Sequence, residues 1–256
     1  MSSPVLLILG AGPNVGLSLT QKFKKEGYRV AIASRSPKED LKSAVDLAIP
    51  ADFSSSPSST ISSIFSRVTI ELGAPNVVVF NAYSVSFAPD GAKPFESVTP
   101  ESFEKDLVVN IAAGYAAAYE FTKMSSPASP GHPRTFIATG NMEYSIIVPE
   151  VFSLGVGKNG LAYVIETAAN QYGKEGKGEK GFWYMADERM DDGSPTMSKI
   201  GGEAHAEFYW ELSQRKTQGK WYATFVRGKG EVGFREEKRA REVVGAGELI
   251  KRTEGW

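Results

Sequence analysis

Short runs of apolar residues alternate with longer amphipathic segments along most of this chain. The apolar runs predict strands at about residues 4–9, 29–34, 47–51, 76–80, 134–139, 181–186 and 221–226. The amphipathic segments predict helices at about residues 15–26, 38–44, 57–72, 100–124, 155–172 and 198–217. Near-continuous apolar strands are typical of a sheet covered on both faces. The pattern therefore predicts an α/β fold: a doubly wound sheet of about seven mostly parallel strands with helices on both faces.

Three segments interrupt this alternation. Residues 84–99 and the glycine- and lysine-rich residues 173–181 are predicted to be loops. Residues 187–197 follow the sixth predicted strand, at the edge where open parallel sheets place ligand-covering loops. The stretch is predicted to be either a lid that covers a ligand or a solvated loop.

The length of 256 residues favours one domain that spans residues 1–256. From Arg227 onward glycine alternates with charged residues, and a stretch of mixed charge follows, EEKRAREVV. We expect this tail, residues 227–256, to pack on the domain or to be partly mobile, with the mixed-charge stretch as a solvated helix.

Composition narrows the classes of partner. Twenty-nine basic and 30 acidic residues give a formal net charge of −1, so no positive field draws the chain to nucleic acid. The absence of cysteine excludes disulfides and thiolate zinc sites, and two histidines argue against a histidine-rich metal site. No apolar run approaches the roughly 20 residues that cross a bilayer, and the N-terminus lacks a basic leader. We expect a cytoplasmic protein without a metal.

A glycine-rich turn follows the first strand and precedes the first helix. Gly10 and Gly12 allow the backbone to turn tightly and to approach a pyrophosphate, whose charge the helix N-terminus favours. Gly16 allows the helix to pack closely on the strand. Strand, turn and helix together predict a dinucleotide-binding fold of the Rossmann type. The spacing is one residue longer than the common fingerprint, and a purely structural turn is the alternative.

The second strand ends in Ser34, Arg35 and Ser36, where many NAD-binding proteins carry an acidic residue. A guanidinium flanked by hydroxyls suits a 2′-phosphate, because arginine donates charge-assisted hydrogen bonds to phosphate oxygens. NADP(H) is therefore favoured over NAD(H). A solvent-facing arginine is the alternative.

These residues resemble the short-chain dehydrogenase/reductase family over nearly the whole chain. The glycine motif of that family, TGxxxGxG, overlays LGAGPNVG, with Asn14 in place of a glycine because asparagine tolerates left-handed backbone. Asp52-Phe53 resembles the family's adenine contact, and Asn81-Ala82 resembles its NAG segment. The resemblance and the turn together imply these cofactor-binding residues: Gly10, Gly12, Asn14, Val15, Gly16, Ser34, Arg35, Ser36, Asp52, Phe53, Asn81, Ala82 and Lys158.

The family's catalytic residues are only partly present. Its Tyr-x-x-x-Lys motif falls on Leu154 and Lys158, so the lysine is kept and the tyrosine is lost. The family serine falls on Thr139 or Gly140, depending on a one-residue choice of register. Asn110 matches the asparagine that supports the family's proton relay. The resemblance thus implies Lys158, Thr139 and Asn110 as catalytic residues, with Lys158 also binding the nicotinamide ribose.

Other side chains are candidates to replace the missing tyrosine. Tyr144 follows the fifth strand, and Tyr163 lies on the helix of Lys158. The residues Asp187-Glu188-Arg189 follow the sixth strand, and His205 lies on the last helix. For each of them a core or surface role is the alternative.

Three functions are compatible with this sequence. The first is NADPH-dependent reduction of a carbonyl, enone or imine of a small hydrophobic molecule, with a non-standard proton donor or water in place of tyrosine. The second is a non-redox enzyme on the same fold, such as a cyclase or isomerase. The third is an NADP(H)-binding regulatory protein without turnover. Members of the family often form dimers or tetramers, so a homodimer or homotetramer is also expected.

Overall fold

The computed structural model describes residues 3–89, 93–124, 129, 131–173 and 180–234, together with the backbone of residues 242–243. Its main sheet has the strand order β3-β2-β1-β4-β5-β7-β8-β9. Seven of these strands are parallel: β1 (Val5–Leu9), β2 (Arg29–Ser34), β3 (Leu47–Pro50), β4 (Val77–Phe80), β5 (Thr135–Thr139), β7 (Phe182–Arg189) and β8 (Tyr222–Val226). The eighth, β9 (Gly230–Glu231), pairs antiparallel with β8. The doubly wound α/β prediction is confirmed, with one short strand more than the seven expected.

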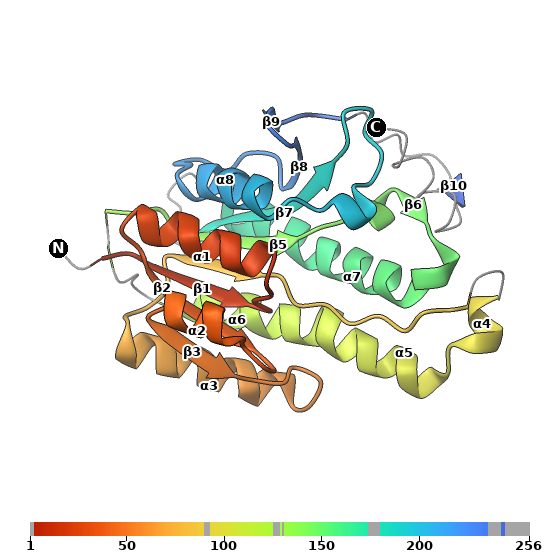
Figure 1. Ribbon diagram of the computed structural model, residues 1–256, viewed down its shortest axis with the longest axis horizontal. Coiled ribbons are helices and arrows are strands. Elements are labelled where there is room, and N and C mark those ends of the chain that lie inside the picture. The colour runs from red at the N-terminus through yellow and green to blue at the C-terminus, as the bar shows by residue number, and fades with distance from the viewer. Residues whose placement is uncertain are drawn as a thin grey trace.

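Helices cover both faces of this sheet (Figure 1). One face carries α1 (Val15–Lys25), α2 (Glu39–Ala44) and α8 (Gly202–Ser213). The other carries α3 (Pro57–Glu71), α6 (Gly114–Lys123) and α7 (Phe152–Ala168). The short α4 (Pro94–Ser97) lies within a segment predicted to be a loop, and α5 (Pro100–Leu107) leads into α6 through the π-helical turn Val108–Ala113. A second π-helical turn, Ala169–Gly173, extends α7.

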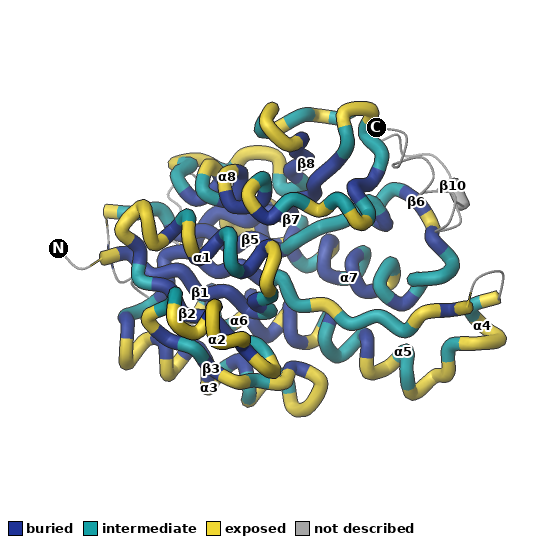
Figure 2. Tube along the Cα trace, viewed as in Figure 1, coloured by how far each residue is buried: buried dark blue, intermediate teal, exposed yellow. Residues whose placement is uncertain are grey.

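Alternation along β1 divides the core between the two faces. Leu6 and Ile8 pack toward α1 and α8, whereas Val5, Leu7 and Leu9 pack toward α3, α6 and α7. All five side chains are fully buried, which explains why this strand is apolar at every position. Figure 2 shows the same buried strands at the centre of the molecule beneath partly exposed helices. Truncating one of these leucines to alanine costs about 2–5 kcal/mol of stability.

The strand order places a ligand edge beside β1. The chain leaves β1 toward β2 and β3, and then crosses back to β4 on the other side of β1. At such a switch point the loops after β1 and β4 diverge and leave a crevice at the carboxyl ends of the strands. The glycine turn after β1 and the segment after β4 both lie at this edge.

Two expectations for the second half of the chain are wrong in part. Strand β7 continues through Arg189, so Asp187, Glu188 and Arg189 are buried strand residues, and only the remainder of residues 187–197 connects β7 to α8. In the tail, β10 (Glu242–Val243) pairs with β6 (Ile146–Ile147), so these two residues form a strand where a helix was predicted. The rest of residues 235–256 and residues 174–179 lie outside the described residues. No helix in the described part of the chain is long and apolar enough to cross a membrane.

Candidate functional site

The three glycines of the turn have three different environments. Gly10 has φ +91°, and a Cβ atom there would lie 2.3 Å from the backbone nitrogen of Ala82. A Cβ atom on Gly16 would lie 2.8 Å from the Cα atom of Ala11, so this glycine allows α1 to pack against the turn. A Cβ atom on Gly12 would meet nothing within 4 Å. Gly10 and Gly16 are therefore required by close packing, whereas Gly12 faces open space where a ligand can approach.

Asn14 makes a hydrogen bond that the sequence did not indicate. Its φ is −92°, so the left-handed backbone that was expected to explain an asparagine here is absent. Its side-chain Nδ2 instead donates a 2.9 Å hydrogen bond to the carbonyl of Ile200, in the connection that leads to α8. Val15, the first residue of α1, is buried. Asn14 thus ties the glycine turn to the segment before α8.

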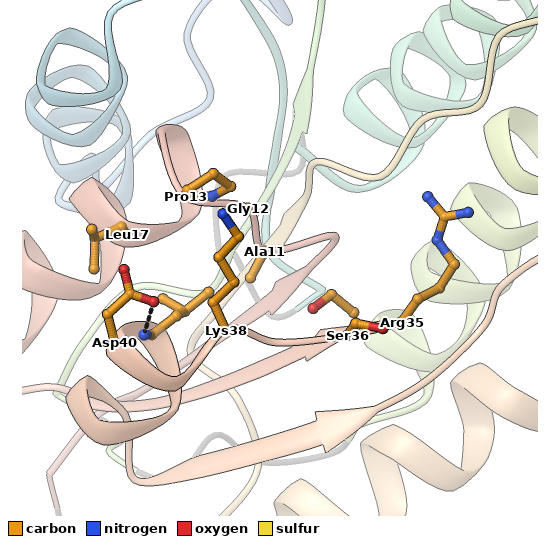
Figure 3. Close-up of a pocket in the computed structure, with 10 residues that line it drawn as sticks. Ala11, Gly12, Pro13, Leu17, Arg35, Ser36, Lys38 and Asp40 are labelled. Carbon is orange, nitrogen blue, oxygen red and sulfur yellow. Dashed lines mark hydrogen bonds between the residues drawn. The ribbon is translucent and has the colours of Figure 1, made fainter.

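A pocket of about 460 Å³ opens between the glycine turn and the end of β2. Figure 3 shows that the side chain of Lys38 extends toward the glycine turn, whereas that of Arg35 extends to the opposite side. The hydroxyl of Ser34 is buried and has no hydrogen-bond partner among the described residues. Ser36 also contributes to the wall. The lining thus includes the cation of Lys38 on the side of the glycine turn, Arg35 at the far end, an unpartnered hydroxyl and the carboxylate of Asp40. The cations and the hydroxyl are groups that suit a phosphate. Sequence reasoning missed Lys38, although it lies three residues beyond Arg35.

Asp52 and Phe53 follow β3 beyond this pocket. Asp52 is exposed, and its Oδ1 accepts a 2.9 Å hydrogen bond from the backbone N–H of Ser54, which lowers the pKa of the carboxyl. The ring of Phe53 belongs to the buried core on the α3 face. A ligand at this edge can therefore reach the side chain of Asp52 but only the backbone of Phe53.

Asn81 connects three strands at the carboxyl edge. Its Nδ2 donates a 2.9 Å hydrogen bond to the Gly10 carbonyl, and its Oδ1 accepts a 2.8 Å hydrogen bond from the Thr139 hydroxyl. Ala82 follows and lies against Gly10. The predicted residues Gly10, Asn81, Ala82 and Thr139 are thus close together in the structure.

Thr139 presents its carbonyl, not its hydroxyl, to Lys158. Residue 137 on the same strand packs toward α1 and α8, and alternation directs the side chain of Thr139 to that face as well. There its hydroxyl accepts a 3.0 Å hydrogen bond from Tyr209. Lys158 approaches from α7 on the opposite face and donates a 2.6 Å hydrogen bond to the Thr139 carbonyl. The hydroxyl and the carbonyl of Thr139 therefore serve opposite faces of the sheet.

Lys158 is buried near the end of β5. Burial lowers the pKa of its ammonium to about 8, although the nearby carboxyls of Glu143 and Asp187 act in the opposite direction. An ammonium has three donors, and the hydrogen bond to Thr139 uses one. Leu154 is on the preceding turn of the same helix and brings no titratable group. The lysine is retained at the site without its expected tyrosine.

Asn110 positions the wall of the site. It lies in the π-helical turn between α5 and α6, where its Oδ1 accepts from the N–H of Ser84 and its Nδ2 donates to the Ser84 carbonyl, both at 2.8 Å. A Cβ atom on Gly157 would lie 2.4 Å from the Cβ atom of Asn110, so the two helices touch beside Lys158. Asn110 therefore fixes the segment after β4 relative to α7.

A buried carboxyl group beside Lys158 was missed by sequence reasoning. Glu143 lies in the short turn Met142–Tyr144 after β5 and is 8% exposed. Burial raises the pKa of its carboxyl to about 7. The only signal in the sequence is a carboxylate shortly after a buried strand, which is too common to single out the residue.

A second buried carboxyl, Asp187, lies at the end of β7. It accepts hydrogen bonds from Arg189 and from the hydroxyl of Tyr222, the latter at 2.8 Å. Burial raises the pKa of Asp187, and the Arg189 guanidinium opposes this rise. The neighbouring Glu188 points to the other face, where its Oε2 accepts from the N–H of Gly201 at 2.7 Å. The candidate trio thus divides between the two faces of the sheet.

The remaining candidates for the proton donor have other environments. Tyr163 is 75% exposed on the outer surface of α7. Tyr144 is partly buried and packs its ring against Tyr222 at a centroid distance of 4.7 Å. His205 is buried in α8, where its Nδ1 hydrogen bonds to the Gly201 carbonyl at 2.8 Å.

Comparison with known proteins supports a family assignment. The chain is 36% identical over 245 residues to the short chain dehydrogenase/reductase dmxR12 of Cryptosporiopsis sp. (strain 8999), with 91% of this chain and 96% of the relative covered. No family model matches the chain.

Solved structures share the fold. A metagenomic short-chain oxidoreductase in complex with NADP has a TM-score of 0.70 at 18% identity, covering 88% of this chain and 97% of the other. BdcA in complex with NADPH has a TM-score of 0.69 at 15% identity, covering 93% and 99%. At these identities the structures support the fold alone. The 36% identity over nearly the full length of dmxR12 shows the family as well as the fold, so the chain belongs to the short-chain dehydrogenase/reductase superfamily.

Proposed function

We propose that this chain is an NADPH-dependent reductase that acts on a carbonyl, enone or imine carbon of a small hydrophobic molecule. The observation that carries the proposal is the pocket between the glycine turn and β2. Gly12 leaves open space at the turn, and the pocket is lined by Arg35, by Lys38 and by Ser34, whose hydroxyl has no hydrogen-bond partner among the described residues. This set of groups is suited to a pyrophosphate at the start of α1 and a 2′-phosphate at the end of β2.

The other residues at this edge fit the same cofactor. NADPH bound there supplies hydride to a substrate held beside its nicotinamide. We infer that Asp52 contacts the adenine side and that Lys158 donates to the nicotinamide ribose. Asn81 and Asn110 hold the backbone around the crevice by the hydrogen bonds described above. The solved NADP and NADPH complexes with this fold support the assignment of the cofactor.

A hydrophobic substrate is supported by the segment that leaves the carboxyl end of β4. Tyr83 and Phe87 are 61% and 69% exposed, so this segment presents apolar rings near the crevice. Exposed rings of this kind bind apolar surfaces of small molecules. The connection from Met190 to Gly201 is the other segment at this edge, and we infer that it bounds the substrate space.

The proposal is tested by following NADPH absorbance with panels of carbonyls, enones and imines. Cofactor binding is measured separately by titrating the fluorescence of the four tryptophans with NADPH and NADH. Tighter binding of NADPH than NADH together with NADPH oxidation is the expected result. Binding without turnover across all three panels contradicts a reductase and favours a regulatory role.

A second candidate is a non-redox reaction on the same fold. Leu154 at the position of the family tyrosine favours it, because the usual proton donor of carbonyl reduction is missing. Analysis of products with and without NADPH separates the two functions. Conversion that needs no cofactor and leaves the oxidation state unchanged favours the non-redox enzyme.

We also propose that the chain forms a homodimer or homotetramer. Tyr115 and Tyr119 on α6 and Tyr163 on α7 are exposed, on the two helices that members of the family pair between subunits. Light scattering coupled to size-exclusion chromatography tests this, and a monomer at micromolar concentration contradicts it.

A further inference from the structure

Glu143 places a carboxyl group next to the helix position where the family tyrosine is missing. A Cβ atom built on Gly155 would lie 3.2 Å from Oε2 of Glu143 and 3.7 Å from its Cβ atom. Gly155 directly follows Leu154 and lies one turn before Lys158 on α7. The carboxyl therefore lies over the first turn of α7, between the lost tyrosine position and the retained lysine.

The backbone of Glu143 is held on both sides. Its N–H donates to Oδ1 of Asn141 at 3.2 Å, and its carbonyl accepts from Nδ2 of Asn159 at 3.0 Å. The same Nδ2 donates to the carbonyl of Gly155 at 2.7 Å, which ties the turn after β5 to α7. The Asn141 side chain also hydrogen bonds to the carboxyl, but one carboxyl oxygen, Oε2, is buried and has no hydrogen-bond partner among the described residues. A buried acceptor without a partner is costly unless it serves a ligand or carries a proton.

Two charged groups face this carboxyl from the elements packed around it. Lys158 approaches from α7 and favours the ionised form, whereas Asp187 approaches from β7 and disfavours it. Burial is the largest effect and, with Asp187 acting in the same direction, raises the pKa of Glu143 to about 7 against the Asn141 hydrogen bond and Lys158. A carboxyl with a pKa near neutrality can both give up a proton and recover it, which is the property required of a general acid.

We propose that Glu143 is the catalytic acid of this chain, in place of the missing tyrosine; the inference rests on the proposed reductase function. The substrate carbonyl carbon takes hydride from NADPH, and the π electrons of the C=O bond move to oxygen. The oxygen takes the proton of the Glu143 carboxyl. The products are the alcohol, NADP⁺ and the Glu143 carboxylate, which recovers a proton from the solvent before the next turnover. Lys158 stabilises the carboxylate through its positive charge.

Glu143→Gln is the main test because it keeps the size of the side chain and removes its exchangeable acid. We expect kcat to fall by about 100-fold or more, the usual contribution of a general acid, while the Kd for NADPH stays within about threefold. Glu150→Gln is the matched control, because Glu150 also has a buried carboxyl oxygen without a partner among the described residues and has no assigned role. Its kcat and Kd are expected to stay within about threefold of wild type.

Glu143→Asp keeps an acid but shortens the side chain by one methylene. It is expected to restore part of the rate lost in Glu143→Gln, and in wild type kcat is expected to fall as pH rises through about 7. A Glu143→Gln enzyme that turns over within about threefold of wild type overturns the proposal. This holds whether or not the variant is less stable, because activity at that level requires a folded protein.

Infrared difference spectroscopy during a pH titration gives a readout that does not depend on activity. The band of a protonated carboxyl is expected to disappear with a midpoint of about 7 in wild type and in Glu150→Gln, and to be absent from this range in Glu143→Gln. A Glu143 band that disappears near the ordinary pKa of 4.5 overturns the proposal even if NADPH is oxidised. If wild type reduces no substrate, the proposed reductase function fails, and the infrared titration alone decides whether Glu143 is an acid at neutral pH.

Discussion

Tyr209 on α8 donates a hydrogen bond of 3.0 Å to the hydroxyl of Thr139 at the end of β5. The same hydroxyl donates to Asn81, which in turn donates to the Gly10 carbonyl, so a chain of polar contacts runs from α8 to the glycine turn. This hydroxyl lies on the face of the sheet opposite α7. We infer from this arrangement that Thr139 stabilises the carboxyl edge, and its catalytic role stays a prediction.

The first prediction follows from this chain of hydrogen bonds. Thr139→Val keeps the shape of the side chain but leaves the Tyr209 hydroxyl and the Asn81 carbonyl without their partner. Each buried group left unpaired costs about 1–3 kcal/mol, so the free energy of unfolding in urea is expected to fall by that order. Thr139→Ser keeps the hydroxyl and serves as the control. A rate loss in Thr139→Val without any loss of stability contradicts this interpretation and restores a catalytic role.

The second prediction concerns Lys38 and the choice of cofactor. Removing its ammonium in Lys38→Ala is expected to weaken NADPH binding about tenfold and to leave NADH binding unchanged, because only NADPH carries the 2′-phosphate. Titrations of tryptophan fluorescence measure both affinities. Lys42→Ala is the control, because Lys42 lies on α2, the helix that directly follows Lys38, and pairs with Glu39 outside the pocket. Equal weakening of NADPH and NADH binding contradicts a phosphate contact.

The third prediction concerns the stability of the protein as a function of pH at Glu143. The folded protein retains the proton of this carboxyl up to about pH 7, whereas the unfolded chain releases it near the ordinary pKa of 4.5. Ionisation therefore favours the unfolded chain, and stability falls as pH rises from about 4.5 to about 7. The difference of about 2.5 pKa units corresponds to up to about 3 kcal/mol.

Glu143→Gln removes this cost at high pH. Its melting temperature is expected to exceed that of wild type at pH 8 and to approach the wild-type value below about pH 4.5, where both states of wild type are protonated. Differential scanning calorimetry across this range is the measurement. A stability difference that does not change with pH shows that the carboxyl titrates normally.

The fourth prediction concerns acid lability at His205. Burial lowers the pKa of this imidazole to about 4, although Glu188 lies 3.5 Å away. The hydrogen bond to the Gly201 carbonyl opposes this shift and the Arg227 guanidinium adds to it, and burial is the largest effect. In the unfolded chain the His205 imidazole binds a proton below about pH 6.5, whereas in the folded protein it stays neutral down to about pH 4. Stability is therefore lost as pH falls from about 6.5 to about 4.

His205→Gln removes that titration. The variant is expected to be less stable than wild type at pH 7.5, because it loses the ring contacts with Tyr209 and Phe225, and to lose less stability on acidification. Urea unfolding at pH 7.5 and pH 5 measures how much the free energy of unfolding falls between these pH values in wild type and in the variant. Parallel losses in both proteins would falsify the assignment of this acid transition to His205.

The sheet could be predicted from the sequence because each of its parallel strands is an apolar run with both faces covered. The order of strands and helices along the chain, together with the glycine turn, then predicted which edge of the sheet binds the ligand and which family the chain resembles. Gly10, Gly12, Asn81 and Lys158 were identified correctly as residues of that edge, because motif spacing fixes their positions along the chain. Their roles in binding and catalysis remain predictions.

Side-chain direction could not be predicted in the same way. A shift of one residue along a strand moves a side chain to the other face, and this decided whether the Thr139 hydroxyl met Lys158 or Tyr209. The extent of β7 was underestimated because Asp187, Glu188 and Arg189 are charged, yet their partners on distant elements allow them to be buried in the strand. The burial of Glu143 likewise depends on α7, which packs over it from a later part of the chain.

The packing of α8 against α1 has a consequence for the order in which this protein is synthesised. Strands β1 to β5 leave the ribosome early, but Phe208, Tyr209 and Leu212 of α8, which belong to the same core cluster as Leu6 and Ile8, come only near residue 213. Until then one apolar face of the nascent sheet has no cover from this helix. This half of the core can therefore be completed only after most of the chain has been synthesised. A ribosome that stalls before α8 leaves an apolar surface exposed, and such a surface is prone to aggregation unless a chaperone binds it.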